Sequence, residues 1–224
     1  MSVFDAAFDT DRAECVQRVA TPRGELALLR RGAHYEIVSN GVFLMDTRDG
    51  RSERLLVAAA LAACAAPAPR VLIGGLGVGF SLAEAVGHGH VGHVTVVEIE
   101  PAVIAWQRTH LAAYTQGAAD DPRVTIVCAD LVAWLDEPGP AYDAICLDID
   151  NGPQWTVTDR NRALYGDDGL RRLRRRLTAG GVLAVWSASR SRPFEARLRR
   201  HFGAVDVHEI PVPRGEPDVV YVAR

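Results

Sequence analysis

The stretch Val71-Leu-Ile-Gly-Gly-Leu-Gly-Val-Gly79 decides how the rest of this 224-residue sequence is interpreted. An apolar run enters a series of glycines, and an amphipathic segment begins at Ser81. This order is typical of a buried strand that turns tightly into a helix. Glycines at positions 75, 77 and 79 allow the tight turn and let a ligand approach where any Cβ atom would clash.

From Arg70 onward, apolar runs alternate with amphipathic segments. The pattern predicts strands over Val71–Gly74, His93–Val97, Val124–Cys128, Ala144–Asp148 and Val182–Trp186. It predicts helices from Ser81 past Ala85, and over Pro101–Tyr114, Leu131–Leu135 and Gly169–Leu177. Such alternation indicates a mostly parallel sheet with helices on both faces. We therefore expect an α/β, Rossmann-like domain over residues 51–224, whose first helix runs from Ser52 to about Cys64.

The two ends of the chain have a different pattern. Near the start, Gly24–Arg30 and Tyr35–Ser39 are strand-like and are separated by a turn, and a third strand at Gly41–Met45 is compatible with the sequence. Residues 1–50 are therefore predicted to form a small β-hairpin domain. Near the end, Val205–Pro211 and Val219–Ala223 are predicted to pair in antiparallel fashion at the edge of the sheet.

Composition excludes several classes of protein. The chain is 48% hydrophobic and 24% charged, as expected for a soluble globular protein with a full core. Its Ala-rich run Val57–Pro67 is shorter than the roughly 20 residues that span a bilayer, and residues 1–11 lack the order of a signal peptide. We expect a cytoplasmic protein with no membrane partner. A net charge of −3 argues against a nucleic-acid partner, and the absence of lysine excludes a Schiff-base or P-loop lysine.

The cysteines and clustered histidines do not predict a metal site. Cys128 and Cys146 occupy apolar runs and are expected to be buried small hydrophobes. His88, His90 and His93 lie near the start of the second predicted strand, away from the glycine turn. No disulfide framework is expected from the four scattered cysteines, which are Cys15, Cys64, Cys128 and Cys146.

Carboxylates follow the predicted strands after the glycine turn. Glu98 ends the second strand about 20 residues beyond Gly79, where these folds hold ribose hydroxyls, whereas Glu100 is better placed to start the next helix. Asp130 ends the third strand, and Asp148 and Asp150 end the fourth. Because ligands of open α/β sheets bind at the carboxyl ends of strands, this arrangement predicts a nucleotide-type ligand.

The residues just described resemble the spermidine synthase branch of the class I S-adenosylmethionine-dependent methyltransferase fold. The similar stretch covers roughly residues 35–200. It is carried by Ile73-Gly-Gly-Leu-Gly-Val-Gly79, Val97-Glu-Ile-Glu-Pro-Ala-Val-Ile104, Asp121-Pro-Arg-Val-Thr-Ile-Val-Cys-Ala-Asp130 and Tyr142-Asp-Ala-Ile-Cys-Leu-Asp148. The N-terminal strands also resemble the small β-domain of that family.

The resemblance implies a role for each matching position. S-adenosylmethionine, or its decarboxylated form, would contact the glycine segment, the ends of the second and fourth strands and the start of the fourth helix. These residues are Gly74, Gly75, Gly77, Gly79, Glu98, Ile99, Asp130, Leu131 and Asp148. Asp148 would be the catalytic base, assisted by Asp150, which would also hold the acceptor. Trp155 and Tyr165 are candidates for the wall of the acceptor pocket.

Departures from the family pattern decide which reaction we expect. Family members usually carry Gly-Gly-Gly-Asp-Gly in the first loop, and that aspartate pairs with the free amine of decarboxylated S-adenosylmethionine. Gly77 stands at this place here, and Phe43 stands where the family has glutamine. These departures therefore favour methyl transfer from S-adenosylmethionine to a small amine or hydroxyl acceptor, with aminopropyl transfer to a polyamine as the alternative.

Two further hypotheses come from other classes. A non-catalytic scaffold that binds a nucleoside would share the same glycines and acids. A nicotinamide-dependent oxidoreductase would suit Glu98, but it does not account for the match that begins at Asp121. Family resemblance also implies a homodimer.

Overall fold

A computed structural model describes residues 12–149, 151–156 and 159–224. The chain divides into two compact units, residues 1–49 and residues 50–224. Within the described ranges, the helices are all too short or too polar to cross a bilayer.

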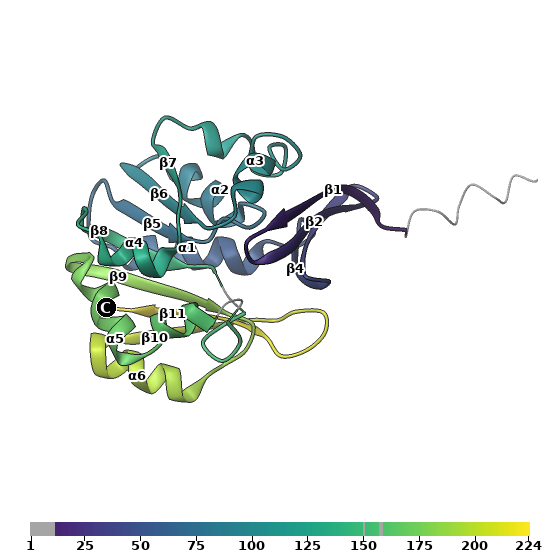
Figure 1. The fold of residues 1–224 in the computed structure, drawn as a ribbon. Helices are drawn as coiled ribbons and strands as arrows, with labels where there is room; N and C mark the ends of the chain where they lie inside the picture. Colours follow the sequence, from purple (N-terminus) through teal and green to yellow (C-terminus); the bar gives the residue numbers. More distant parts are fainter. Residues whose placement is uncertain (1–11, 150, 157–158) are drawn as a thin grey trace, which may run out of the picture. The chain divides into compact units, whose positions relative to one another are not determined.

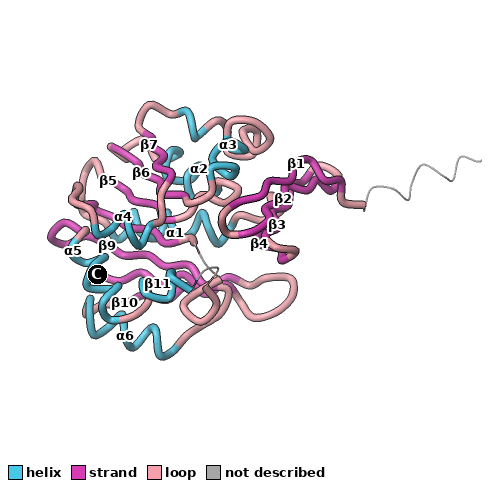
Figure 2. Tube along the Cα trace, in the orientation of Figure 1, coloured by secondary structure: helices cyan, strands magenta, loops and turns pink. Residues whose placement is uncertain are grey.

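The first unit is a four-stranded antiparallel sheet, shown in magenta in Figure 2. Its strands pair in chain order and are β1 (Glu14–Thr21), β2 (Gly24–Arg31), β3 (His34–Ser39) and β4 (Val42–Asp46). The sequence did not predict β1, because a register shift between Cys15 and Gln17 interrupts its alternation. Asn40 and Gly41 both have positive φ, which suits the tight turn between β3 and β4.

The second unit contains a seven-stranded sheet with the order β10-β11-β9-β8-β5-β6-β7 (Figure 1). Five strands are parallel: β5 (Arg70–Gly74), β6 (His93–Glu98), β7 (Val124–Cys128), β8 (Tyr142–Leu147) and β9 (Leu177–Ser187). At one edge, β11 (Asp218–Ala223) pairs antiparallel with both β9 and β10 (Val205–Ile210). The predicted α/β fold with an antiparallel C-terminal edge is confirmed.

Helices cover both faces of this sheet. They are α1 (Arg51–Ala63), α2 (Phe80–Gly87), α3 (Pro101–Gln107), α4 (Leu131–Asp136), α5 (Asp167–Arg175) and α6 (Arg192–Phe202), with 3₁₀ turns η1 (Ala118–Asp120) and η2 (Asp159–Leu164). On one face, α1 packs along β8, β9 and β11 and against α2. On the other, leucines of α4, α5 and α6 join Leu72 and Leu183 of the sheet in one buried core.

Several expected boundaries shift for local physical reasons. The predicted helix Pro101–Tyr114 ends at Gln107, where the Thr109 hydroxyl bonds the carbonyl of Ala105 and competes with the helical pattern. Strand β9 begins at Leu177 because pairing with β8 overrides Gly180 and Gly181. Cys128 is exposed on edge strand β7, so its expected burial was wrong, whereas Cys146 is buried as predicted.

The strand order reverses between β5 and β8. The chain runs outward from β5 through β6 to β7 in one direction, and from β8 to β9 in the other. Ligands of doubly wound sheets bind at such a switch point, beyond the carboxyl ends of the strands. We call the segments that follow the ends of β5, β6, β7 and β8 the carboxyl rim.

Candidate functional site

The glycine segment after β5 is fixed against the neighbouring strands. The N–H of Gly75 donates to the carbonyl of Val97 at 2.9 Å, and the N–H of Asp148 donates to the carbonyl of Gly74 at 2.8 Å. Gly75 has φ +88°, and a Cβ atom there would lie 2.2 Å from the carbonyl oxygen of Asp148. Only glycine fits this position, because both the left-handed backbone and the close contact exclude a side chain.

Glu98, the last residue of β6, links this strand to the glycine segment through a hydrogen bond. Its Oε2 accepts the N–H of Leu76 at 2.9 Å, and its Oε1 accepts the N–H of Glu100 at 2.8 Å. Burial raises the pKa of the Glu98 carboxyl, and these N–H donors oppose that rise. A carboxylate has about four acceptor positions, so Glu98 keeps capacity for further donors such as hydroxyl groups.

Asp130 has a structural role at the end of β7 that the sequence analysis did not assign. Its Oδ1 caps helix α4 by accepting the N–H groups of Val132 and Ala133, and its Oδ2 accepts from the exposed Arg160 at 3.1 Å. The next residue, Leu131, packs where a Cβ atom on Gly74 would stand, at 2.5 Å. The start of helix α4 therefore contacts the glycine segment through Leu131.

Asp148 follows the end of β8 and contacts the same segment. Its carboxyl group is closely surrounded by protein, and Oδ2 accepts a 2.7 Å hydrogen bond from the hydroxyl of Ser81 on α2. Burial raises the pKa of Asp148 to about 6; the Ser81 hydrogen bond opposes the rise and the charge of Asp218 adds to it. A carboxyl group with a pKa near neutrality can accept or release a proton at physiological pH.

Two acids that the sequence analysis missed face Asp148. Glu53 is buried in the first turn of α1, where Ser52 donates to its Oε2 at 3.0 Å. Burial, and then the charges of Asp148 and Asp218, raise the pKa of Glu53 to about 7. We call Glu53, Asp148 and Asp218 the carboxylate cluster. Acids are common in the first turn of any helix, and Asp218 is remote in sequence, so no local pattern singles out either residue.

The structure shows the surroundings of two of the three other predicted acceptor residues, Tyr165 and Trp155. Tyr165 is buried in the core below the sheet, where its ring packs edge-on against Phe194 at 5.7 Å. Trp155 is 75% exposed. Asp150 lies outside the described residues.

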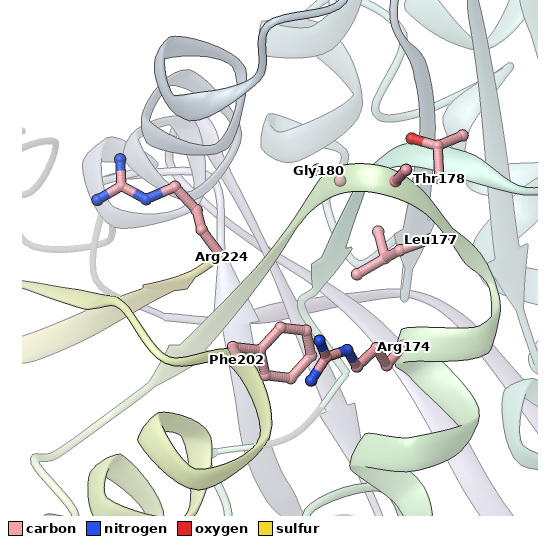
Figure 3. A pocket seen from close by; sticks show the side chains of 8 residues that line it. Arg174, Leu177, Thr178, Gly180, Phe202 and Arg224 are labelled. Carbon is pink, nitrogen blue, oxygen red and sulfur yellow. The ribbon is translucent and has the colours of Figure 1, made fainter.

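A cavity of about 280 Å³ lies at the opposite end of the sheet (Figure 3). Leu177 and Thr178, which open β9, line it together with Arg174 and Phe202. The Arg174 guanidinium lies over the Phe202 ring, 5.8 Å from its centre, and also donates to the carbonyl of His201. The cavity shares no residue with the carboxyl rim and is not part of the candidate site.

The described residues contain no group of three or more His, Cys, Asp or Glu side chains with the geometry to hold a metal ion. The carboxylate cluster offers charge and proton acceptance, and the glycine segment and Glu98 offer a hydrogen-bonded wall. Shared contacts join Gly75 to Asp148, Leu76 to Glu98, and Gly74 to Leu131.

Comparisons with known proteins identify relatives of this chain. A curated relative from Pseudomonas aeruginosa, "Polyamine aminopropyltransferase 2", is 34% identical over 170 residues, which cover 71% of this chain and 46% of that protein. "Polyamine aminopropyltransferase 1" of Streptomyces coelicolor is 37% identical over 129 residues, covering 57% of this chain and 24% of that protein. The chain thus spans less than half the length of either relative.

Solved structures support the fold. A spermidine synthase in complex with the transition-state analogue AdoDATO superposes with a TM-score of 0.74 at 19% identity, covering 93% of this chain and 73% of that one. Human methyltransferase-like protein 13, in complex with SAH, gives a TM-score of 0.61 at 21% identity over 77% of this chain and 82% of that one.

A family model described as "Spermine/spermidine synthase domain" matches residues 54–191. The match includes α2, the glycine segment and the carboxyl rim, and it covers more than half of the chain. The chain belongs to the spermine/spermidine synthase domain family, within the Rossmann-like class I methyltransferase fold.

Proposed function

We propose that this protein is an aminopropyltransferase, which transfers an aminopropyl group from decarboxylated S-adenosylmethionine to an aliphatic amine of the polyamine class. The observation that carries this proposal is the carboxylate cluster at the carboxyl rim of a spermine/spermidine synthase domain. The relatives named as polyamine aminopropyltransferases add support. Their names reverse the order of preference derived from sequence, in which methyl transfer came first.

The chemistry of the cluster suits a cationic acceptor. The three acids lie close enough to interact electrostatically, and burial and mutual repulsion raise the pKa values of Glu53 and Asp148. An alkylammonium group placed among them would reduce that repulsion and would be held by charge-assisted hydrogen bonds. An anionic acceptor would be repelled by the same charges.

The donor would lie against the glycine segment. We assign Glu98 to the ribose hydroxyls, since its two oxygens keep acceptor capacity beyond the N–H groups of Leu76 and Glu100. We place the adenine near Asp130 and Leu131, with Ile99 beside it, and the aminopropyl chain across Gly75 and Gly77. Gly79, with φ +92°, is the N-cap of α2 and lets the backbone turn away from the donor.

The reaction is a displacement at carbon. The unprotonated acceptor nitrogen attacks the methylene carbon next to the sulfonium, and the carbon–sulfur bond breaks with its electron pair going to sulfur. The new secondary ammonium gives up one proton, which the ionised carboxylate of Asp148 accepts. Alignment of nitrogen and carbon contributes up to about 7–11 kcal/mol in favourable cases, and a positioned base contributes about 10²–10⁴-fold.

Methyl transfer from intact S-adenosylmethionine is the second candidate, and one observation favours it. The segment Leu76-Gly-Val78 carries no carboxylate to pair with the free amine of the decarboxylated donor. Incubating the protein with each donor and a series of diamines, followed by mass spectrometry, separates the two reactions. We expect products heavier by an aminopropyl group, with loss of at least about 100-fold in Asp148→Asn. Methylated product alone, or no product from either donor, would overturn the proposal.

A further inference from the structure

The hydroxyl of Ser81 lies between two acceptors. Its oxygen is 2.7 Å from Oδ2 of Asp148 and 3.2 Å from the main-chain carbonyl oxygen of Glu53, and the residue is only 2% exposed. A serine hydroxyl has one hydrogen and can donate to only one of these acceptors at a time. Which bond forms therefore depends on whether the carboxyl group of Asp148 carries a proton.

Both protonation states of Asp148 can be satisfied without movement of a side chain. When Asp148 is ionised, the Ser81 hydroxyl donates to Oδ2. When Asp148 is protonated, its own O–H donates to the Ser81 oxygen, and the serine hydrogen is then directed to the carbonyl of Glu53. That carbonyl belongs to the first turn of α1, so the receiving atom is held by the helix.

We propose that Ser81 is a positioning residue that reverses its hydrogen bond when Asp148 gains a proton, so that Asp148 can receive a proton from the acceptor amine without leaving its place. This inference rests on the proposed function for its purpose, but the reversal itself is a property of the protein alone. The proton moves from nitrogen to Asp148, and the hydroxyl only rotates, so no further reactant is needed.

The charges around Asp148 act on the same equilibrium. Glu53 of α1 and Asp218 of β11 face it, and Cys146 lies two residues before it on β8. Negative charge on the two acids favours protonation of Asp148, whereas donation from Ser81 favours its ionised form. The Ser81 hydrogen bond therefore opposes the effect of these two charges on the pKa of Asp148 and keeps Asp148 able to act as a base near neutral pH.

The test measures the titration of Asp148 directly, by NMR of ¹³C-labelled carboxyl groups, with the Asp148 signal assigned by Asp148→Asn. We expect a wild-type midpoint near 6. Ser81→Ala should raise the midpoint by about one pH unit, because the hydrogen bond lost from the ionised form is stronger than the one lost from the protonated form. Ser81→Thr, which keeps the hydroxyl, should restore the wild-type value.

Thr178→Val is the matched control. The Thr178 hydroxyl donates to Asp143 at 2.9 Å at the other end of β8, so its loss removes the same type of bond away from the cluster. We expect no effect of this variant on the Asp148 midpoint. Infrared difference spectra should also show the C=O stretch of protonated Asp148 at higher frequency in Ser81→Ala, since its O–H loses its acceptor.

Unchanged midpoint and band in Ser81→Ala, or equal shifts in Ser81→Ala and Ser81→Thr, would overturn the proposal. Neither measurement requires turnover. Absence of aminopropyl transfer would therefore refute the proposed function without affecting the result for Ser81.

Discussion

Replacing Glu53 with glutamine should stabilise the protein, by an amount that grows with pH. The side chain is 9% exposed, and its pKa rises from an ordinary value of 4.5 to about 7 in the folded state. The folded protein therefore binds a proton that the unfolded chain has released between these two values. Its free energy of unfolding must fall as the pH rises through this window.

The size of the effect follows from the pKa. A rise from 4.5 to about 7 corresponds to about 3 kcal/mol of destabilisation once the group is ionised in both states. Glutamine keeps an oxygen for the Ser52 hydroxyl and carries no charge. The Glu53→Gln variant should therefore gain about 3 kcal/mol at pH 8, and only about 1 kcal/mol at pH 5, where the folded-state carboxyl is already protonated.

The assay is urea unfolding at several pH values between 5 and 8, for wild type and variant. Glu216→Gln is the matched control, because Glu216 is exposed and its removal should change the free energy of unfolding by no more than about 0.5 kcal/mol. If the free energies of unfolding of wild type and Glu53→Gln differed by the same amount at every pH in this range, the inference that folding raises the pKa of Glu53 would be refuted.

Two other predictions concern the frame of the site. Gly75→Ala should lower the free energy of unfolding by more than about 3 kcal/mol, since its Cβ atom would lie 2.2 Å from the Asp148 carbonyl oxygen. The control is Gly117→Ala, where φ is +72° and the space around the Cβ position is open. This variant should lower the free energy of unfolding by only about 1 kcal/mol, measured by thermal unfolding. Equal losses would contradict the steric argument. Asp130→Ala should lose about 1 kcal/mol in chemical unfolding because α4 loses its cap. Asp130→Asn should stay within a few tenths, and a full loss there would show that charge, not capping, stabilises this turn.

Much of the fold could be predicted from sequence because its periodic signals are strong. Strand β7 (Val124–Cys128) has the predicted bounds, since a short β-branched and apolar run lies between Arg123 and the Ala129-Asp130 pair. Helix α6 (Arg192–Phe202) was missed even though Ser191 caps it, because its arginines leave only Phe194 and Leu198 as fully buried apolar positions. The arginine-rich sequence of α6 shows too weak an apolar pattern to predict the helix, which tertiary packing stabilises.

Only some residues of the candidate site could be predicted from the sequence. Glycines and acids that directly follow a strand, such as Gly75, Glu98 and Asp148, can be found because the strand itself gives their position. Glu53 reaches the cluster from helix α1, and Asp218 reaches it from strand β11, which β9 separates from β8. Their proximity to Asp148 is a property of the topology, and no spacing along the chain encodes it.

The position of β11 has a consequence for biosynthesis. This strand lies between β9 and β10, although it follows both in the chain. Until residues 218–223 dock, β9 has an unpaired edge, and such edges invite pairing with other chains. Docking of residues 218–223 removes that hazard and, in the same step, delivers Asp218. The nascent protein therefore gains its protected sheet and its full set of acids together.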